Sequence, residues 1–141
     1  MEFNFEQEFK KIMNTAQAVA LATSIDNMPN VRIVNFVYDE TTPGIIYFAS
    51  FPDNQKVIEF EKNNNVSFTS IPDGSIGHVR AKGTVTKSAR TLMDMADMFV
   101  AKIPYYDETI QAVGNILALY EIKFDKAGVI VDMQNAGAVN F

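Results

Sequence analysis

Residues 31–40 read VRIVNFVYDE, an alternating stretch rich in β-branched side chains, and this pattern predicts a β-strand. The stretch AVALATSI at 18–25 is a second dense apolar run. Between them, residues 26–29 read DNMP, a combination typical of turns. Together the three segments predict a β-hairpin, in which Val31 and Ile33 share one face of the second strand.

Strand-like and helix-like segments follow one another along the rest of the chain. Strands are predicted at 45–51, 66–71, 76–87 and 118–125, with a short last strand at 129–133. Helices are predicted at 4–15, from an N-cap at Asp53 to Asn63 and from Ser88 to Pro104, with a short helical turn at 107–113. This order favours a mainly β fold, an antiparallel barrel of about six or seven strands with peripheral helices. We expect residues 1–141 to form a single domain, with the barrel at about 18–131.

The composition excludes several classes of function. The chain has no cysteine, which excludes disulfides, thiolate metal sites and a cysteine nucleophile. A net charge of −5 argues against nucleic-acid and anionic-lipid partners. No apolar run approaches the roughly 18 residues that cross a membrane, and the N-terminus lacks the features of a signal peptide. We therefore expect a cytoplasmic protein with neither a membrane nor a nucleic-acid partner.

Motifs for acid–base, metal or nucleotide chemistry are sparse. His78 is the only histidine, no paired-histidine spacing exists, and the carboxylates are scattered, so no metal site is predicted and no catalytic residue stands out. Neither G-x-G-x-x-G nor G-x-x-x-x-G-K-[ST] occurs. Any bound phosphate must therefore be held by side chains and a helix N-terminus.

One pair of cations suits a phosphate. Arg32 places a charge in an apolar strand. Burying that charge is costly unless the side chain reaches the exposed rim of the sheet or pairs with an anion. Lys56 follows the strand at 45–51, near the start of the next predicted helix. If that strand pairs beside the one at 31–40, Arg32 and Lys56 converge on one site. The alternative is an edge salt bridge for Arg32 and an ordinary surface position for Lys56.

The same segments carry a family resemblance. The order VRIVNFVYDE, then IIYFASFPDNQKVIEFEKNNNVSF at 45–68, then HVRAKGTV at 78–85 resembles the pyridoxamine 5′-phosphate oxidase-like, FMN-binding split-barrel superfamily. The likeness covers about residues 8–124 and is greatest to the short, general-stress type of member. It implies a split β-barrel and a homodimer with FMN at the subunit interface.

The resemblance also implies roles for individual residues. Arg32 matches the arginine that binds the FMN phosphate, and Gln55 and Lys56 match a basic pair at a helix start. Two strand segments match those along the flavin ring and ribityl chain: Ile33, Val34 and Asn35, and Phe48, Ala49 and Ser50. His78 and Arg80 match a strand that approaches the partner's flavin, with an ordinary cross-strand role as the alternative.

Two departures bear on activity. The family's oxidases carry arginine where this chain has Gln55, and the chain has no tryptophan, whereas the oxidases use a C-terminal segment that contains one. Both argue against pyridoxamine-phosphate oxidase activity itself. The resemblance favours an FMN-dependent oxidoreductase acting on a small substrate. The alternatives are a non-catalytic ligand-binding or stress-response protein on the same fold, and a relative that binds haem or a deazaflavin.

Overall fold

A strongly curled antiparallel sheet forms the body of the protein, in a computed structural model that describes residues 3–141. The first two residues of the predicted domain lie outside the described residues. The strands are β1 (Ala18–Ile25), β2 (Met28–Asn35), β3 (Val37–Tyr38), β4 (Ile45–Ser50), β5 (Asn65–Ser70), β6 (His78–Lys87), β7 (Ala118–Lys123), β8 (Lys126–Ile130) and β9 (Ala136–Asn140). Seven of them run in the order β2-β1-β5-β6-β7-β4-β3. The predicted split-barrel fold is confirmed.

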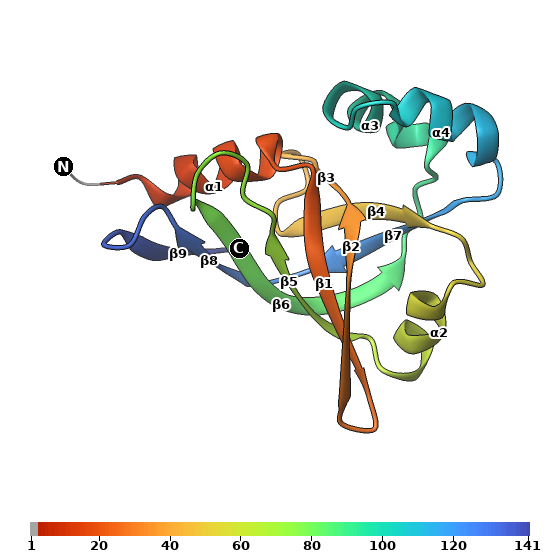
Figure 1. Cartoon of the computed structure of the whole chain (residues 1–141), viewed down its shortest axis with the longest axis horizontal. Coiled ribbons are helices and arrows are strands. Elements are labelled where there is room, and N and C mark those ends of the chain that lie inside the picture. Colours follow the sequence, from red (N-terminus) through yellow and green to blue (C-terminus); the bar gives the residue numbers. More distant parts are fainter. Residues whose placement is uncertain (1–2) are drawn as a thin grey trace.

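The barrel is split at β6, the longest strand. The end of β6 near Lys87 pairs with β7, whereas the end near His78 pairs with β8, which also pairs with β9 (Figure 1). Gly83 lies where β6 changes partner, and a Cβ there would collide with the carbonyl oxygen of Lys123. The close backbone approach expected of a strand glycine is therefore present.

The predicted hairpin is also confirmed, with one difference. β1 and β2 pair from Ile25↔Met28 to Ala18↔Asn35, and both turn residues have positive φ, as a tight two-residue turn requires. The predicted strand at 31–40 is broken at Phe36 into β2 and β3, which lie at opposite edges of the sheet. The face that carries Val31 and Ile33 is exposed, at 63% and 67%.

Within residues 3–141, four α-helices and one 3₁₀ turn surround the sheet: α1 (Phe5–Thr15), α2 (Gln55–Lys62), η1 (Met93–Met95), α3 (Ala96–Lys102) and α4 (Tyr106–Val113). Figure 1 shows α1 at one end of the sheet and the α3–α4 pair at another. Phe9 and Met13 of α1 are fully buried in the barrel core, and the predicted helix at 4–15 is confirmed. A second core lies between α3, α4 and the outer face of β4 and β7.

Some predicted boundaries are wrong. The helix after β4 begins at Gln55 with Asn54 as N-cap, not Asp53. The single helix predicted from Ser88 is instead η1 followed by α3. The Ser88 hydroxyl donates to Glu121 and accepts from the backbone N–H of Arg90, so it caps no helix. The segment after β7 is two strands, β8 and β9, although only the residues at 129–133 were predicted as a strand.

Candidate functional site

A cleft of about 260 Å³ opens where β2 and β4 end, beside the start of α2 and one face of α4. Its wall is mostly apolar, with amide, hydroxyl and ammonium groups at a few positions. The lining residues are Ile33, Val34, Asn35, Ala49, Ser50, Phe51, Asn54, Lys56, Tyr106, Thr109, Val113 and Leu117. An apolar wall with a few polar groups is typical of a small-molecule site.

Six of the residues predicted from the sequence line this cleft: Ile33, Val34, Asn35, Ala49, Ser50 and Lys56. They come from the ends of β2 and β4 and from the first turn of α2. The strands predicted at 31–40 and 45–51 pair only in part: Val37 and Tyr38 of β3 pair with β4, whereas β2, which carries Arg32, pairs with β1. The curled sheet and the pairing of β3 with β4 just beyond Phe36 bring the ends of β2 and β4 together.

Lys56 supplies the positive charge of the cleft. Its ammonium is half-buried and lies 3.4 Å from the hydroxyl of Ser50, to which it donates. Burial lowers the pKa of Lys56, and the nearby positive charge of Arg32 lowers it further. Within residues 3–141, no carboxylate lies within ion-pair distance of this ammonium. A half-buried cation without a counter-ion is a group that an anion would stabilise.

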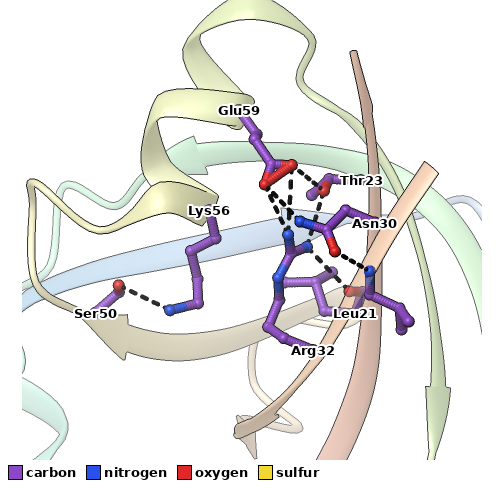
Figure 2. Close-up of polar contacts among 8 residues, drawn as sticks. Leu21, Thr23, Asn30, Arg32, Ser50, Lys56 and Glu59 are labelled. Atoms are coloured by element: carbon purple, nitrogen blue, oxygen red, sulfur yellow. Dashed lines mark hydrogen bonds and ion pairs between the residues drawn. The ribbon is translucent and has the colours of Figure 1, made fainter. Parts of the chain in front are cut away.

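Arg32 lies next to this cation but is already engaged (Figure 2). Its Nη2 donates to both carboxylate oxygens of Glu59, at 2.9 and 3.4 Å. Its Nη1 donates to the hydroxyl of Thr23 at 2.9 Å and to the carbonyl of Leu21 at 3.1 Å. The side chain of Arg32 is 19% exposed and that of Glu59 is 5% exposed. The salt bridge that the sequence left open as an alternative for Arg32 is present, whereas Lys56 is not an ordinary surface residue.

Glu59 is the centre of this network. Burial alone would raise the pKa of Glu59, but hydrogen bonds from Thr23, Asn30 and Arg32 outweigh burial and hold that pKa below its ordinary value. Thr23 donates at 2.8 Å and Asn30 at 3.1 Å. The carboxylate is therefore ionised at neutral pH. Sequence reasoning missed Glu59, because Arg32 and Glu59 are 27 positions apart and no local pattern links them.

The other predicted site residues lie outside the cleft. Phe48 is fully buried in the barrel core, where it stacks on Tyr120 at 5.7 Å between ring centres. Gln55 is exposed at the start of α2. His78 and Arg80 lie on β6, and Nδ1 of His78 is 2.7 Å from the carbonyl oxygen of Ile76. The structure therefore gathers the ends of β2 and β4 with Lys56, and leaves these four elsewhere.

Helix α4 forms a wall of the cleft that the sequence did not predict. Tyr106, Thr109 and Val113 line it, and Leu117 follows just beyond the helix. Burial raises the pKa of Tyr106 to about 12, so its phenol stays neutral at physiological pH. A short helical turn was predicted here, but its position against the cleft depends on the packing of α3 and α4 on β4 and β7.

Two other features were sought among the described residues, a metal centre and a membrane-spanning helix. Residues 3–141 contain no group of three or more histidine, aspartate or glutamate side chains arranged to hold a metal ion. None of the helices among these residues is both long and apolar enough to cross a bilayer.

Comparison with known proteins now assigns the family. The family model described as pyridoxamine 5′-phosphate oxidase-like matches residues 12–136. The chain belongs to this family. Comparison with curated protein sequences finds no match.

Solved structures share the fold at low sequence identity. General Stress Protein 26 from Bacillus anthracis superposes with a TM-score of 0.75 at 12% identity, covering 99% of this chain and 100% of that one. A haem-binding protein from Mycobacterium smegmatis gives 0.75 at 10% identity, covering 99% of this chain and 59% of its own. An FAD-binding protein from Mesorhizobium loti gives 0.63 at 15% identity, covering 94% and 91%. Members of this fold thus include a flavin-binding and a haem-binding protein.

Proposed function

We propose that the protein binds FMN in the cleft between β2, β4, α2 and α4, with the phosphate at Lys56 and Ser50. The observation that carries the proposal is the half-buried ammonium of Lys56, which has no carboxylate partner in residues 3–141. The amide of Asn54 also lines the cleft and would supply a neutral donor, and the Ser50 hydroxyl, which donates to the Phe51 carbonyl at 3.2 Å, would have to turn from it to reach the phosphate. Arg32 lies next to Lys56, but its guanidinium is paired with the carboxylate of Glu59, so Lys56 is the unpaired cation of the site.

The apolar part of the cleft suits an aromatic ring system. Ile33, Val34 and Ala49 form one side of it, and Val113 and Leu117 form another. These side chains would orient the flavin ring and exclude water from one of its faces, and the amide of Asn35 could hydrogen-bond to the polar edge of the ring.

A second copy of the chain would complete the site. A cleft of about 260 Å³ is smaller than the roughly 300–1,000 Å³ of ordinary small-molecule pockets. Beside it, β2 is an edge strand with exposed Met28, Val31 and Ile33. Such a cluster of large apolar side chains at a sheet edge is typical of a protein–protein contact. We therefore place the FMN site at the interface of a homodimer.

The residues that line the cleft indicate which tasks the protein would perform and which it would leave to the flavin. None of the twelve is a histidine, aspartate, glutamate or cysteine, and the Tyr106 phenol is neutral and not a base at physiological pH. When bound, the flavin supplies the redox chemistry. The chain's own residues bind the phosphate, orient the ring and exclude water. We infer an FMN-dependent oxidoreductase that acts on a small substrate.

A titration with FMN tests this proposal. The purified protein should be yellow or should quench the fluorescence of added FMN with micromolar or tighter affinity, and riboflavin should bind more weakly. A colourless protein that leaves FMN fluorescence unchanged would reject the proposal. Reduction of the bound flavin by NADH or NADPH with turnover on an acceptor would separate an oxidoreductase from a non-catalytic flavin-binding protein.

Haem is the second candidate, and one contact favours it. Nδ1 of His78 lies 2.7 Å from the carbonyl oxygen of Ile76, so Nε2 would be the nitrogen that holds a haem iron. His78 lies outside the cleft, so haem would occupy a different surface. An absorbance scan with added haem decides between the two, since a Soret shift that His78→Ala abolishes would support haem.

A further inference from the structure

The carboxylate of Glu59 changes the charge of the proposed phosphate site. Glu59 follows Lys56 by three residues on α2, so the two side chains leave the helix on neighbouring positions. Lys56 faces the cleft, whereas Glu59 is 4% exposed and turns toward Arg32 (Figure 2). Of the two cations near the site, Arg32 is thus neutralised by a buried anion and Lys56 is not.

We propose that Glu59 determines phosphate specificity, because its carboxylate cancels the charge of Arg32 and so reduces the advantage of a doubly charged phosphate over a singly charged one. The proposal rests on the proposed binding of a flavin phosphate at Lys56. A free phosphate monoester such as that of FMN carries about −1.5 to −2 charges at pH 7. A phosphate within a diester or diphosphate link, as beside the ribityl chain of FAD, carries one.

The physical reason is that the attraction of a phosphate to the site and the cost of its desolvation depend differently on its charge. Attraction to a site with one unbalanced cation grows in proportion to the charge of the phosphate. The cost of removing that phosphate from water grows faster, roughly with the square of its charge. With Arg32 neutralised by Glu59, the second negative charge of a monoester gains little attraction and costs additional desolvation. With Arg32 released, the same monoester would meet two cations.

The geometry indicates that Glu59 does more than fill space. Thr23 and Asn30 donate to it, and so does the guanidinium of Arg32, at 2.9 Å. Thr23 and Asn30 donate to different oxygens of Glu59, so a glutamine of the same shape could accept from one of them, but it could not cancel the charge of Arg32. Glu59→Gln therefore removes the charge at this position while keeping the size and shape of the side chain.

The experiment compares three ligands on three proteins at pH 7.5. Riboflavin, FMN and FAD are titrated by fluorescence into the wild-type chain, Glu59→Gln and Glu61→Gln. Glu61 is a matched control, because it lies on the same helix, is exposed and forms no ion pair within residues 3–141. Circular dichroism and thermal melts verify that each variant is folded.

Glu59→Gln should strengthen FMN binding by about fivefold more than FAD binding and leave riboflavin unchanged, whereas Glu61→Gln should alter all three by less than about twofold. A Glu59→Gln variant that changes FMN and FAD equally, or that weakens FMN, would overturn the proposal. The second of these results would mean that Glu59 only positions Arg32.

A measurement without flavin separates this proposal from the proposed function. Inorganic phosphate is titrated into the same three proteins, and the amide signals of Ser50 and Lys56 are followed by NMR. At pH 7.5, a tighter phosphate response in Glu59→Gln than in Glu61→Gln supports the role of Glu59 even if no flavin binds. Equal responses in both variants reject that role, even if FMN binds to the cleft.

Discussion

The ammonium of Lys102 lies 3.6 Å from the centre of the Phe36 ring and donates to the Phe36 carbonyl at 3.0 Å. It also donates to the carbonyl of Met13 at 2.8 Å. Lys102 ends α3, Phe36 joins β2 to β3, and Met13 lies near the end of α1. One side chain therefore fastens the helical pair beside the cleft to the barrel and to α1.

This contact predicts a pH-dependent stability. Burial lowers the pKa of Lys102 from 10.5 to about 7. Between these two values the unfolded chain binds more protons than the folded chain, so the free energy of unfolding should rise with pH, by at most about 1.4 kcal/mol per unit. Lys102→Met keeps the length of the side chain and removes its charge. Urea unfolding at pH 7, 8 and 9 should show a smaller slope in this variant than in the wild-type chain.

Lys126→Met is the control for this prediction, because Lys126 is exposed on β8. The free energy of unfolding of Lys126→Met should change with pH as steeply as that of the wild-type chain. If Lys102→Met retains the full wild-type slope, burial of Lys102 is not the origin of the pH dependence.

The ion pair between Arg32 and Glu59 predicts non-additive stability. Arg32→Met leaves a carboxylate of 5% exposure without its cation and should lower the free energy of unfolding by about 3 kcal/mol. Adding Glu59→Gln removes that unpaired charge, so the double variant should recover part of the loss. A double-mutant cycle measured by urea unfolding gives the coupling, and additive losses would contradict the assignment.

The Arg32–Glu59 pair also shows where sequence reasoning stopped. The hairpin, α1 and the succession of the main strands along the chain could be predicted, because each has a local period or turn signal. The sequence indicated that Arg32 needed an anion but not which one, since Glu59 reaches it only through the packing of α2 on β1 and β2. β9 was missed for a related reason. Its residues AGAVN have weak strand propensity, and their pairing with β8 holds them in place.

Lys56 predicts which part of the flavin the cleft holds. Lys56→Met should weaken FMN binding by about 10- to 100-fold, as expected for the loss of a charge-assisted hydrogen bond, and should leave riboflavin nearly unchanged. Lys62→Met is a matched control, since Lys62 is exposed at the other end of the same helix. Fluorescence titration of both ligands measures this. Equal losses for FMN and riboflavin would place the phosphate elsewhere.

Gly83 predicts a steric limit at the split of the barrel. A Cβ at this position would meet the carbonyl oxygen of Lys123 on the adjacent strand, so Gly83→Ala should cost about 1–3 kcal/mol of stability. Gly128 on β8 is a suitable control, because its nearest atom to an added Cβ is 3.7 Å away. Thermal melts should show a lower midpoint for Gly83→Ala and an almost unchanged midpoint for Gly128→Ala. Equal midpoints in the two variants would contradict the predicted clash.

The exposed side chains of β2 predict how the proposed dimer and the cofactor are linked. Ile33 is 67% exposed in one chain and also lines the cleft, so it belongs to both the proposed interface and the proposed site. A lysine there would bring a charge into an apolar contact between two copies. Ile33→Lys should therefore shift the mass in light scattering from twice 15.7 kDa to 15.7 kDa and reduce FMN affinity together with it. Met133 is 93% exposed and lies away from both surfaces, so Met133→Lys should keep the dimer and the affinity. If Ile33→Lys remains dimeric, the edge of β2 is not the interface, and the cleft must be completed by another surface of the second copy.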